Sequence, residues 1–139
     1  IKAKNCYINK NAELKEVDLF HNAGFIEIEK SFDASEFQYF KNNKKISVGE
    51  SLLLEASDEI ENLGQIYSLG TMSLKAKTIH NVDILDLKGN FSINAENFIN
   101  NGVIINDNQE STGSILANIF NIDGKIFAPK LYNSLTMLS

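Results

Sequence analysis

Two aspartates are the residues of this chain whose spacing suggests hydrolytic chemistry. Asp83 and Asp123 each stand two residues after an asparagine, in Asn81-Val82-Asp83 and Asn121-Ile122-Asp123. Two carboxylates can act as general acid and general base in glycoside hydrolysis when roughly 6.5–9.5 Å separates them. If the fold aligns the two positions, the chain is a candidate polysaccharide lyase or hydrolase. Aspartate is also common in turns for backbone reasons alone.

The other potentially reactive side chains are isolated. His21 and His80 each precede an asparagine, but 59 residues (80 − 21) separate them, so we expect them to face solvent or a partner and not to share a metal. Cys6 is the single cysteine and has no histidine placed to activate it. Lys41, Lys44 and Lys45 make a short basic cluster that we interpret as a solvated edge. We expect no metal and no cofactor.

Composition excludes some classes of partner. The chain has 139 residues, a mass of 15.5 kDa and a formal net charge of −5. All 13 cationic residues are lysine, and because arginine is the usual phosphate-recognising residue, nucleic acid is not an expected partner. No apolar run approaches the roughly 18 residues of a membrane span. The first residue is Ile and not Met, so we expect a piece of a longer or processed protein.

The elements that would position these residues follow from an internal repeat. Asparagine recurs at intervals of 20, 20, 19, 19 and 21 residues, at Asn22, Asn42, Asn62, Asn81, Asn100 and Asn121. A large apolar residue stands two positions before each of them and another stands four positions after, one place later in the last copy. The position two after the asparagine holds Gly24, Gly64 and Gly102, with Gly124 one place late, but Lys44 and Asp83 in two copies.

A second set of glycines, at 49, 70, 89 and 113, precedes short runs in which apolar residues alternate with polar ones. Alternation with period two indicates strands. Sequence signals of β-hairpin turns are rare in this chain, so three short strands per repeat are best explained as one coil of a parallel solenoid. We predict an all-β parallel β-helix of about six coils, with 19–21 residues per coil. It forms one domain over 1–139, well defined at 42–128 and irregular at 1–21 and 29–41. A β-sandwich is the competing fold.

The solenoid predicts several stacked rows. The six repeated asparagines would form a ladder of side-chain amides, and the glycine two places later would supply a left-handed turn conformation. The alanines at 56, 76 and 95 would fill a corner. Asp83 and Asp123 would occupy one row with Gly102 between them, about 9.6 Å apart at two coil spacings.

One segment interrupts the repeat. Residues 29–40 read EKSFDASEFQYF and contain no glycine. Aromatic residues in such an interruption are candidates for a recognition surface, and Phe32, Phe37 and Tyr39 are the residues we select. The alternative is that they pack inside a longer coil or cap the end of the helix.

Residues 62–106 resemble the haemagglutinin repeat of filamentous-haemagglutinin-type exoproteins, a family that includes contact-dependent growth-inhibition stalks. The likeness lies in Asn62-Leu63-Gly64-Gln65-Ile66 and in Gly70-Thr71-Met72-Ser73-Leu74-Lys75-Ala76. The resemblance covers about 42–128 and weakens where glycine is lost, at Lys44 and Asp83. It implies a right-handed β-helix, two-partner secretion through an outer-membrane protein, and adhesion or toxin delivery at the bacterial cell surface. The family's repeats carry no catalytic residues.

We therefore expect a non-catalytic rod segment of a secreted or cell-surface exoprotein that binds a receptor or glycan, or that presents a toxin module. The first alternative is a β-helical polysaccharide lyase or hydrolase. The second is a self-assembling β-solenoid scaffold that polymerises end to end.

Overall fold

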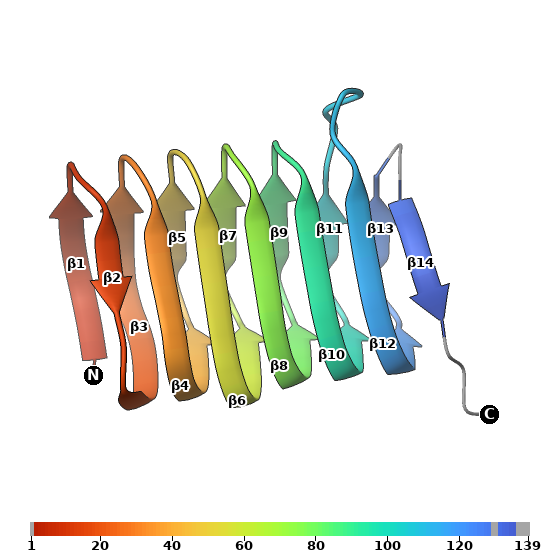
Figure 1. The fold of residues 1–139 in the computed structure, drawn as a ribbon, viewed down its shortest axis with the longest axis horizontal. Coiled ribbons are helices and arrows are strands. Elements are labelled where there is room, and N and C mark those ends of the chain that lie inside the picture. The colour runs from red at the N-terminus through yellow and green to blue at the C-terminus, as the bar shows by residue number, and fades with distance from the viewer. Residues whose placement is uncertain (1, 129–130, 136–139) are drawn as a thin grey trace.

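A computed structural model describes residues 2–128 and 131–135, and the parts of the predicted domain at 1, 129–130 and 136–139 lie outside the described residues (Figure 1). The described residues form no helix. They form fourteen strands: β1 (Lys2–Ile8), β2 (Ala12–Leu14), β3 (Val17–Ile28), β4 (Phe32–Asn42), β5 (Lys45–Val48), β6 (Leu52–Asn62), β7 (Gln65–Ser68), β8 (Met72–Asn81), β9 (Ile84–Leu87), β10 (Phe91–Asn100), β11 (Val103–Ile105), β12 (Gly113–Ile122), β13 (Lys125–Phe127) and β14 (Leu131–Leu135).

The strands wind into a parallel β-helix of about six turns, which confirms the predicted fold class. The long strands β4, β6, β8, β10 and β12 run down the front of Figure 1, and the short strands β5, β7, β9, β11 and β13 run up the back as the chain advances to the right. That sense of winding is right-handed. Each strand pairs in parallel with its equivalent in the next coil, for example β6 with β8 and β8 with β10.

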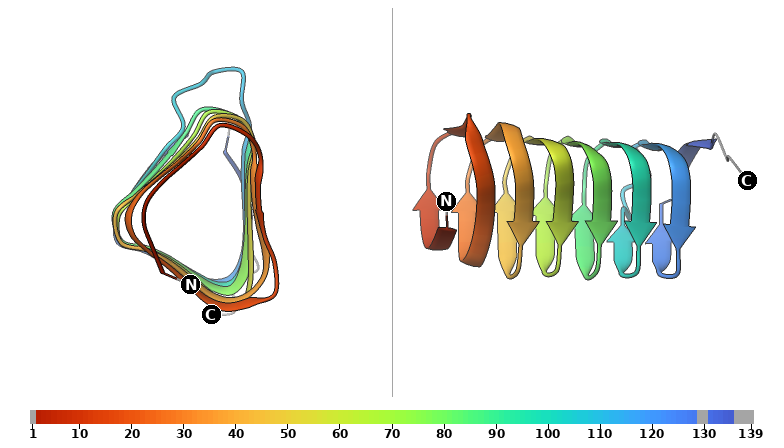
Figure 2. Two further views of the ribbon diagram at one scale, coloured as in Figure 1. Left: turned by 90° about the vertical axis from the view of Figure 1, so that its left-hand side faces the viewer. Right: turned by 90° about the horizontal axis from the view of Figure 1, so that it is seen from below.

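Each coil has a three-sided outline when it is viewed along the axis (Figure 2). We expected three separate short strands per coil, but hydrogen bonding joins two of the sides into one strand of about ten residues that bends at the predicted alanine corner. Ala56, Ala76 and Ala95 are buried there, and the pairing of β6 with β8 shifts register just after it. Small side chains let the continuous strand turn without losing its neighbours.

The interior is filled by rows of apolar side chains that alternate with outward residues. Ile46, Ile66, Leu85 and Ile104 stack in register from β5 to β11 and are 0–1% exposed. Because burying such a side chain stabilises the fold by about 1.5–3 kcal/mol, the continuous rows supply the driving force that holds the coils together.

A ladder of asparagine amides runs along the interior beside these rows. Each Nδ2 donates to the Oδ1 of the next asparagine, with distances of 2.8 Å from Asn22 to Asn42 and 2.9 Å at each later step as far as Asn100. The same amides also donate to backbone carbonyls of the next coil, as Asn62 does to Ile84 O at 2.9 Å. All five side chains are at most 2% exposed, so the ladder satisfies polar groups that water cannot reach.

Asn121, the sixth predicted member, is not in the ladder. Ile122 is the residue in register with Asn100, and Asn121 is exposed. The extra residues of this repeat lie earlier, in the segment 106–112, so the step from Asn100 to Ile122 spans 22 positions (122 − 100). An unpaired loop can absorb an insertion, whereas a shift inside β12 would reverse the two faces of the strand.

The predicted reason for the glycines is also wrong. No described glycine has a positive φ, and the two non-glycine residues that do are Glu16 and Glu36. The glycines are needed because the coils approach closely at the turns. A Cβ on Gly64 would lie 2.0 Å from the backbone oxygen of Lys44 in the preceding coil. The turn that contains Lys44 keeps the same register as the turn at Gly64, because Asn42 pairs with Asn62 before it and Lys45 pairs with Gln65 after it.

Replacing Asn62 by alanine should destabilise the protein by about 2–4 kcal/mol, because the amides of Asn42 and Asn81 each lose a buried partner. Urea unfolding followed by circular dichroism measures the change. Asn43→Ala is the matched control, since this neighbouring side chain is exposed and its loss should leave the free energy of unfolding almost unchanged. Equal effects of the two variants would contradict the ladder's role.

Gly64→Ala should destabilise the fold by about 1–3 kcal/mol, because the added methyl group forces two backbones apart. Lys44→Ala changes the same turn position of the preceding coil, where a side chain is already present, and should be nearly neutral in the same unfolding measurement. The explanation fails if Gly64→Ala is as stable as the parent protein.

Candidate functional site

The two aspartates of the predicted carboxylate pair do not share a row. Asp83 is aligned with Gly102, and Gly102 with Gly124. Asp123 is instead level with Asn101, whose Nδ2 lies 3.4 Å from Asp123 Oδ2. The extra residues at 106–112 that remove Asn121 from the ladder also move Asp123 out of the row of Asp83. The row geometry from which the hydrolase alternative was derived is therefore absent.

The two histidines lie in one row with Lys41 and Glu61 between them, as the repeat predicts. Sequence reasoning missed a cluster around the second one, in which ligand atoms of Glu59, Glu61 and His80 lie within 4.8 Å of one another. Alternation along β6 brings both glutamates outward beside the next coil. His80 Nε2 is 2.6 Å from Asn101 Oδ1, and Lys41 Nζ is 3.6 Å from Glu61 Oε1. Glu61 therefore lies between Lys41 and His80 on the outer surface of the coils.

The predicted aromatic recognition surface is wrong for two of its three residues. Phe32 and Phe37 are each 2% exposed, and the ring of Phe37 lies 6.0 Å from those of Phe20 and Phe40. Phe37 is aligned with Ala56, so a large residue fills the corner in this coil. The alternative of internal packing is thus the observed one for these two residues.

Tyr39 is the exposed member, at 42%. It lines a shallow hollow of about 130 Å³ that includes Lys41, Glu59 and Glu61. The charge of Asp58 and a hydrogen bond with it raise the pKa of Tyr39. The phenol is protonated at neutral pH, as in an ordinary tyrosine, and can act as a hydrogen-bond donor.

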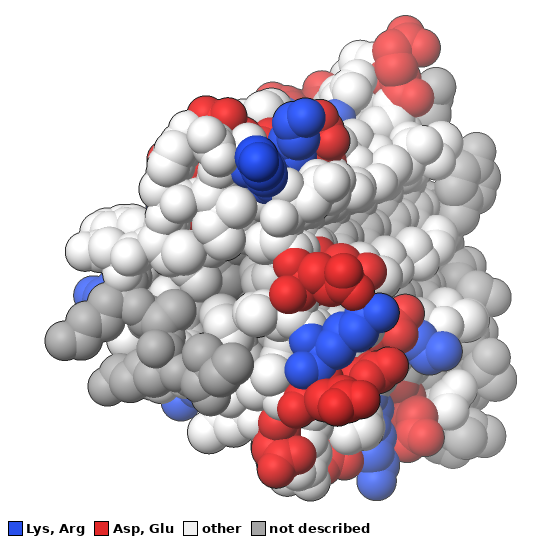
Figure 3. Space-filling view, turned by 60° about the vertical axis from the view of Figure 1, so that its left-hand side comes forward, with Lys and Arg blue, Asp and Glu red and all other residues white. Residues whose placement is uncertain are grey.

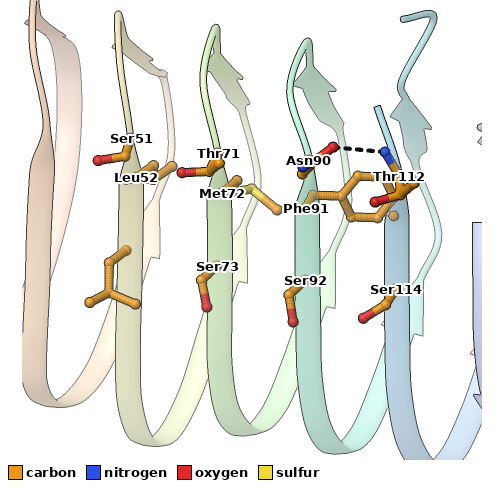
Figure 4. A pocket seen from close by; sticks show the side chains of 12 residues that line it. Ser51, Leu52, Thr71, Met72, Ser73, Asn90, Phe91, Ser92, Thr112 and Ser114 are labelled. Carbon is orange, nitrogen blue, oxygen red and sulfur yellow. Dashed lines mark hydrogen bonds between the residues drawn. The ribbon is translucent and has the colours of Figure 1, made fainter. Parts of the chain in front are cut away.

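A larger groove runs along the axis at the upper part of the front face (Figure 4). Its volume is about 530 Å³. One wall is the row of residues that stand immediately before strands β6, β8, β10 and β12. The other wall is the row of residues two positions further along each of these strands. The rows are Ser51, Thr71, Asn90 and Thr112, and Leu53, Ser73, Ser92 and Ser114. The residues between them, such as Met72 and Phe91, point inward and are buried.

The strand geometry explains this arrangement. Residues i and i+2 point to the same side of a strand, so the two residues that flank an inward one both reach the surface. Parallel pairing in register then repeats the pair in every coil at about 4.8 Å. Short polar side chains therefore form one row at four successive coils, and serine forms the second row at three coils, with Leu53 at the first position.

The polar groups of the groove are largely free for a ligand. Among the described residues, the hydroxyl groups of Thr71, Ser73, Ser92 and Ser114 form no hydrogen bond, while Asn90 Oδ1 accepts from Thr112 N at 2.8 Å. The residues that line the groove include no Asp, Glu, Lys, Arg or His. Hydroxyl groups both donate and accept, so the groove suits an uncharged ligand with many hydroxyl or amide groups.

A loop at residues 106–112 projects beyond the outline of the coils next to this groove (Figure 2). Hydrogen bonds within its base hold it. Asn106 Nδ2 donates to Gly89 O at 2.8 Å, Ser111 Oγ to Asn106 Oδ1 at 2.6 Å, and Asn108 Nδ2 to Lys88 O at 2.7 Å. The loop ends at Thr112 in the wall of the groove, so it adjoins the groove at its last coil.

Charge is present on the loop but not in the groove. Lys88 Nζ lies 3.0 Å from Asp107 Oδ1, and this hydrogen bond lowers the pKa of Asp107 and raises the pKa of Lys88. Figure 3 shows acidic and basic side chains lying together in mixed groups, with uncharged surface between one group and the next. The protein therefore offers both a neutral surface and charged surfaces along one rod.

No protein-family model matches the chain, and searches of curated proteins and of solved structures find no match for it either. In the part of the chain that the structure describes, no helix is long and apolar enough to cross a membrane.

The loop should loosen in acid. Because the pKa of Asp107 is lowered in the folded state, its contribution is complete above its ordinary pKa of 3.8 and is lost as the pH falls through the lowered value. Amide hydrogen exchange of residues 107–111, measured by NMR as pH falls, should speed up beyond the intrinsic pH dependence. An identical profile in Asp107→Asn would contradict this account.

Proposed function

We propose that this chain is a non-catalytic rod segment of a bacterial cell-surface exoprotein and that it binds a neutral glycan along the groove between its two hydroxyl rows. The observation that supports the proposal best is the combination of unpaired hydroxyl groups and an uncharged lining, beside a loop whose base is held by hydrogen bonds. The resemblance to filamentous-haemagglutinin-type repeats supports the cellular setting, and it implies secretion through an outer-membrane partner.

The chemistry of the groove favours a glycan over other partners. A glycan chain carries hydroxyl groups along its whole length, and these can pair with donors and acceptors that recur at every coil. Nucleic acid would require cationic contacts to its phosphates, and the lining has none. The rigid stack of coils holds the rows at a constant spacing, so little conformational entropy is lost when a chain binds.

The same lining disfavours catalysis at this site. General acid–base catalysis requires a titratable group within hydrogen-bond reach of the reacting atom, and the residues that line the groove offer none at neutral pH. The aromatic residue of the groove, Phe91, is only 4% exposed and cannot stack on a sugar ring. We therefore expect weak binding at one site, strengthened where several segments bind one polymer.

Binding to immobilised neutral polysaccharides, such as β-glucan and mannan, tests the proposal. Ser92→Lys should lower the affinity at least tenfold because a long cation enters the groove. Ser47→Lys on β5, at the back of the coils, is the matched control and should bind like the parent protein. Binding to none of these polymers, or equal binding by both variants, would overturn the proposal.

The same samples test the enzyme alternative. Release of new reducing ends or unsaturated products that disappears on Asp83→Asn or Asp123→Asn would favour a polysaccharide hydrolase or lyase. The proposal predicts that no product accumulates while the polymer is retained.

A further inference from the structure

A histidine and two glutamates on the outer face of β6 and β8 have the chemistry and the spacing of a metal site. Ligand atoms of Glu59, Glu61 and His80 lie within 4.8 Å of one another, and none of these residues lines the hydroxyl groove. We propose that the three side chains bind one divalent transition-metal ion, for which Zn²⁺ is the best fit. This inference does not rest on glycan binding.

Strand pairing holds the three ligands in place. Glu59 and Glu61 are two positions apart on β6, so their side chains leave the same face of the strand. His80 of β8 pairs in register with Glu61, and neighbouring strands lie about 4.8 Å apart. The ligands therefore come from two adjacent coils of one rigid stack, and only the side-chain torsions have to adjust when a metal binds.

Two hydrogen bonds outside the cluster fix the proton of His80 on its far ring nitrogen. An ionised carboxylate only accepts, so Asn101 Nδ2 is the donor to Asp123 Oδ2, which lies 3.4 Å away. The Oδ1 atom of the same amide lies 2.6 Å from His80 Nε2 and has to accept a hydrogen. Nε2 therefore carries the proton of the neutral ring, and Nδ1 keeps its lone pair.

That lone pair faces a carboxylate. His80 Nδ1 lies 3.8 Å from Glu61 Oε2, which is too far for a hydrogen bond, and in the neutral ring both atoms are acceptors. Two acceptors that face each other repel unless a cation stands between them, and Glu59 adds a third acceptor to the pair. Metal-binding histidines commonly have this arrangement, in which one nitrogen binds the metal and the other donates to an outer oxygen.

The charges around the cluster also favour a cation. Lys41 Nζ lies 3.6 Å from Glu61 Oε1, whereas Oε2 is the oxygen that faces His80. Lys41 therefore neutralises part of the negative charge without occupying the space between the ligands. Two glutamates and one lysine leave a formal charge of −1 (−2 + 1) beside a neutral imidazole, and this charge attracts a dication.

The donor set favours zinc among the common divalent ions. One imidazole nitrogen and two carboxylate oxygens are ligands of Zn²⁺, whereas Mg²⁺ and Ca²⁺ prefer oxygen ligands. In a tetrahedral zinc site the ligand atoms stand roughly 3.3 Å apart, which small rotations of the two glutamate side chains can reach. The side chains of His80 and Glu61 are 26% and 27% exposed, so water or an atom of a partner can complete the coordination.

Isothermal titration calorimetry with zinc chloride at neutral pH tests the site, in a Cys6→Ser background that removes the exposed thiol as a competing ligand. The Cys6→Ser chain should bind one zinc ion. His80→Ala and Glu61→Gln should each weaken binding at least about tenfold, because even the loss of an outer hydrogen bond to a ligand has that effect. His21→Ala is the matched control, since His21 lies in the same outward row but three coils away, and it should bind zinc like the Cys6→Ser chain.

No zinc binding by the Cys6→Ser chain, or an equal loss of affinity in His21→Ala, would overturn the proposal. Urea unfolding curves of every variant establish that they fold.

NMR of the isotopically labelled histidine rings tests the ligand atom. Zinc should change the Nδ1 signal of His80, while Nε2 keeps its proton. Asn101→Leu should weaken zinc binding about 10–100-fold, because Nε2 loses its acceptor, and Asn101→Asp, which keeps an acceptor there, should retain binding.

Two results of this experiment would contradict the site. One is zinc bound through Nε2. The other is a His80 ring that carries protons on both nitrogens at neutral pH and does not respond to zinc, because a simple ion pair with Glu61 would then explain the cluster.

Discussion

Close stacking of one backbone coil on the next is the constraint on which the rest of this structure depends. It requires a residue without a side chain where turns touch, as at Gly64, and it requires a partner for every buried amide, which the ladder from Asn22 to Asn100 supplies. It also places every outward residue beside its equivalent in the next coil. A short polar residue repeated in the sequence therefore becomes a continuous row on the surface, and two such rows become a groove.

The repeat in the sequence predicted the fold, because the period and the alternation of apolar residues are direct consequences of coil stacking. The inward rows, the alanine corner and the row of His21 and His80 all follow from that period. It could not locate the insertion in the last repeat. In the sequence, aligning Asn121 with Asn100 fits the repeat as well as aligning Ile122 with Asn100. Only the loop at 106–112 shows where the extra residues lie. The misplaced Asp123 follows from the same ambiguity.

The candidate site was harder to predict than the fold. Serine and threonine residues scattered over the repeats have no distinctive motif, and their significance depends on which side of each strand they occupy. The aromatic residues of 29–40 attracted attention because they are unusual in the sequence, but Phe32 and Phe37 fill the interior. A row of outward hydroxyl groups at one position of successive repeats is the signal that could have revealed the groove. It appears only after the repeats are aligned.

Mapping a neutral oligosaccharide by NMR on the isotopically labelled chain tests the functional account most directly. The account predicts that backbone amides of residues 51–53, 71–73, 90–92 and 112–114 shift together and saturate with one dissociation constant. Shifts concentrated instead around Tyr39 and Glu61, with the groove unchanged, would contradict it, because the ligand would then bind the charged face and not the hydroxyl rows.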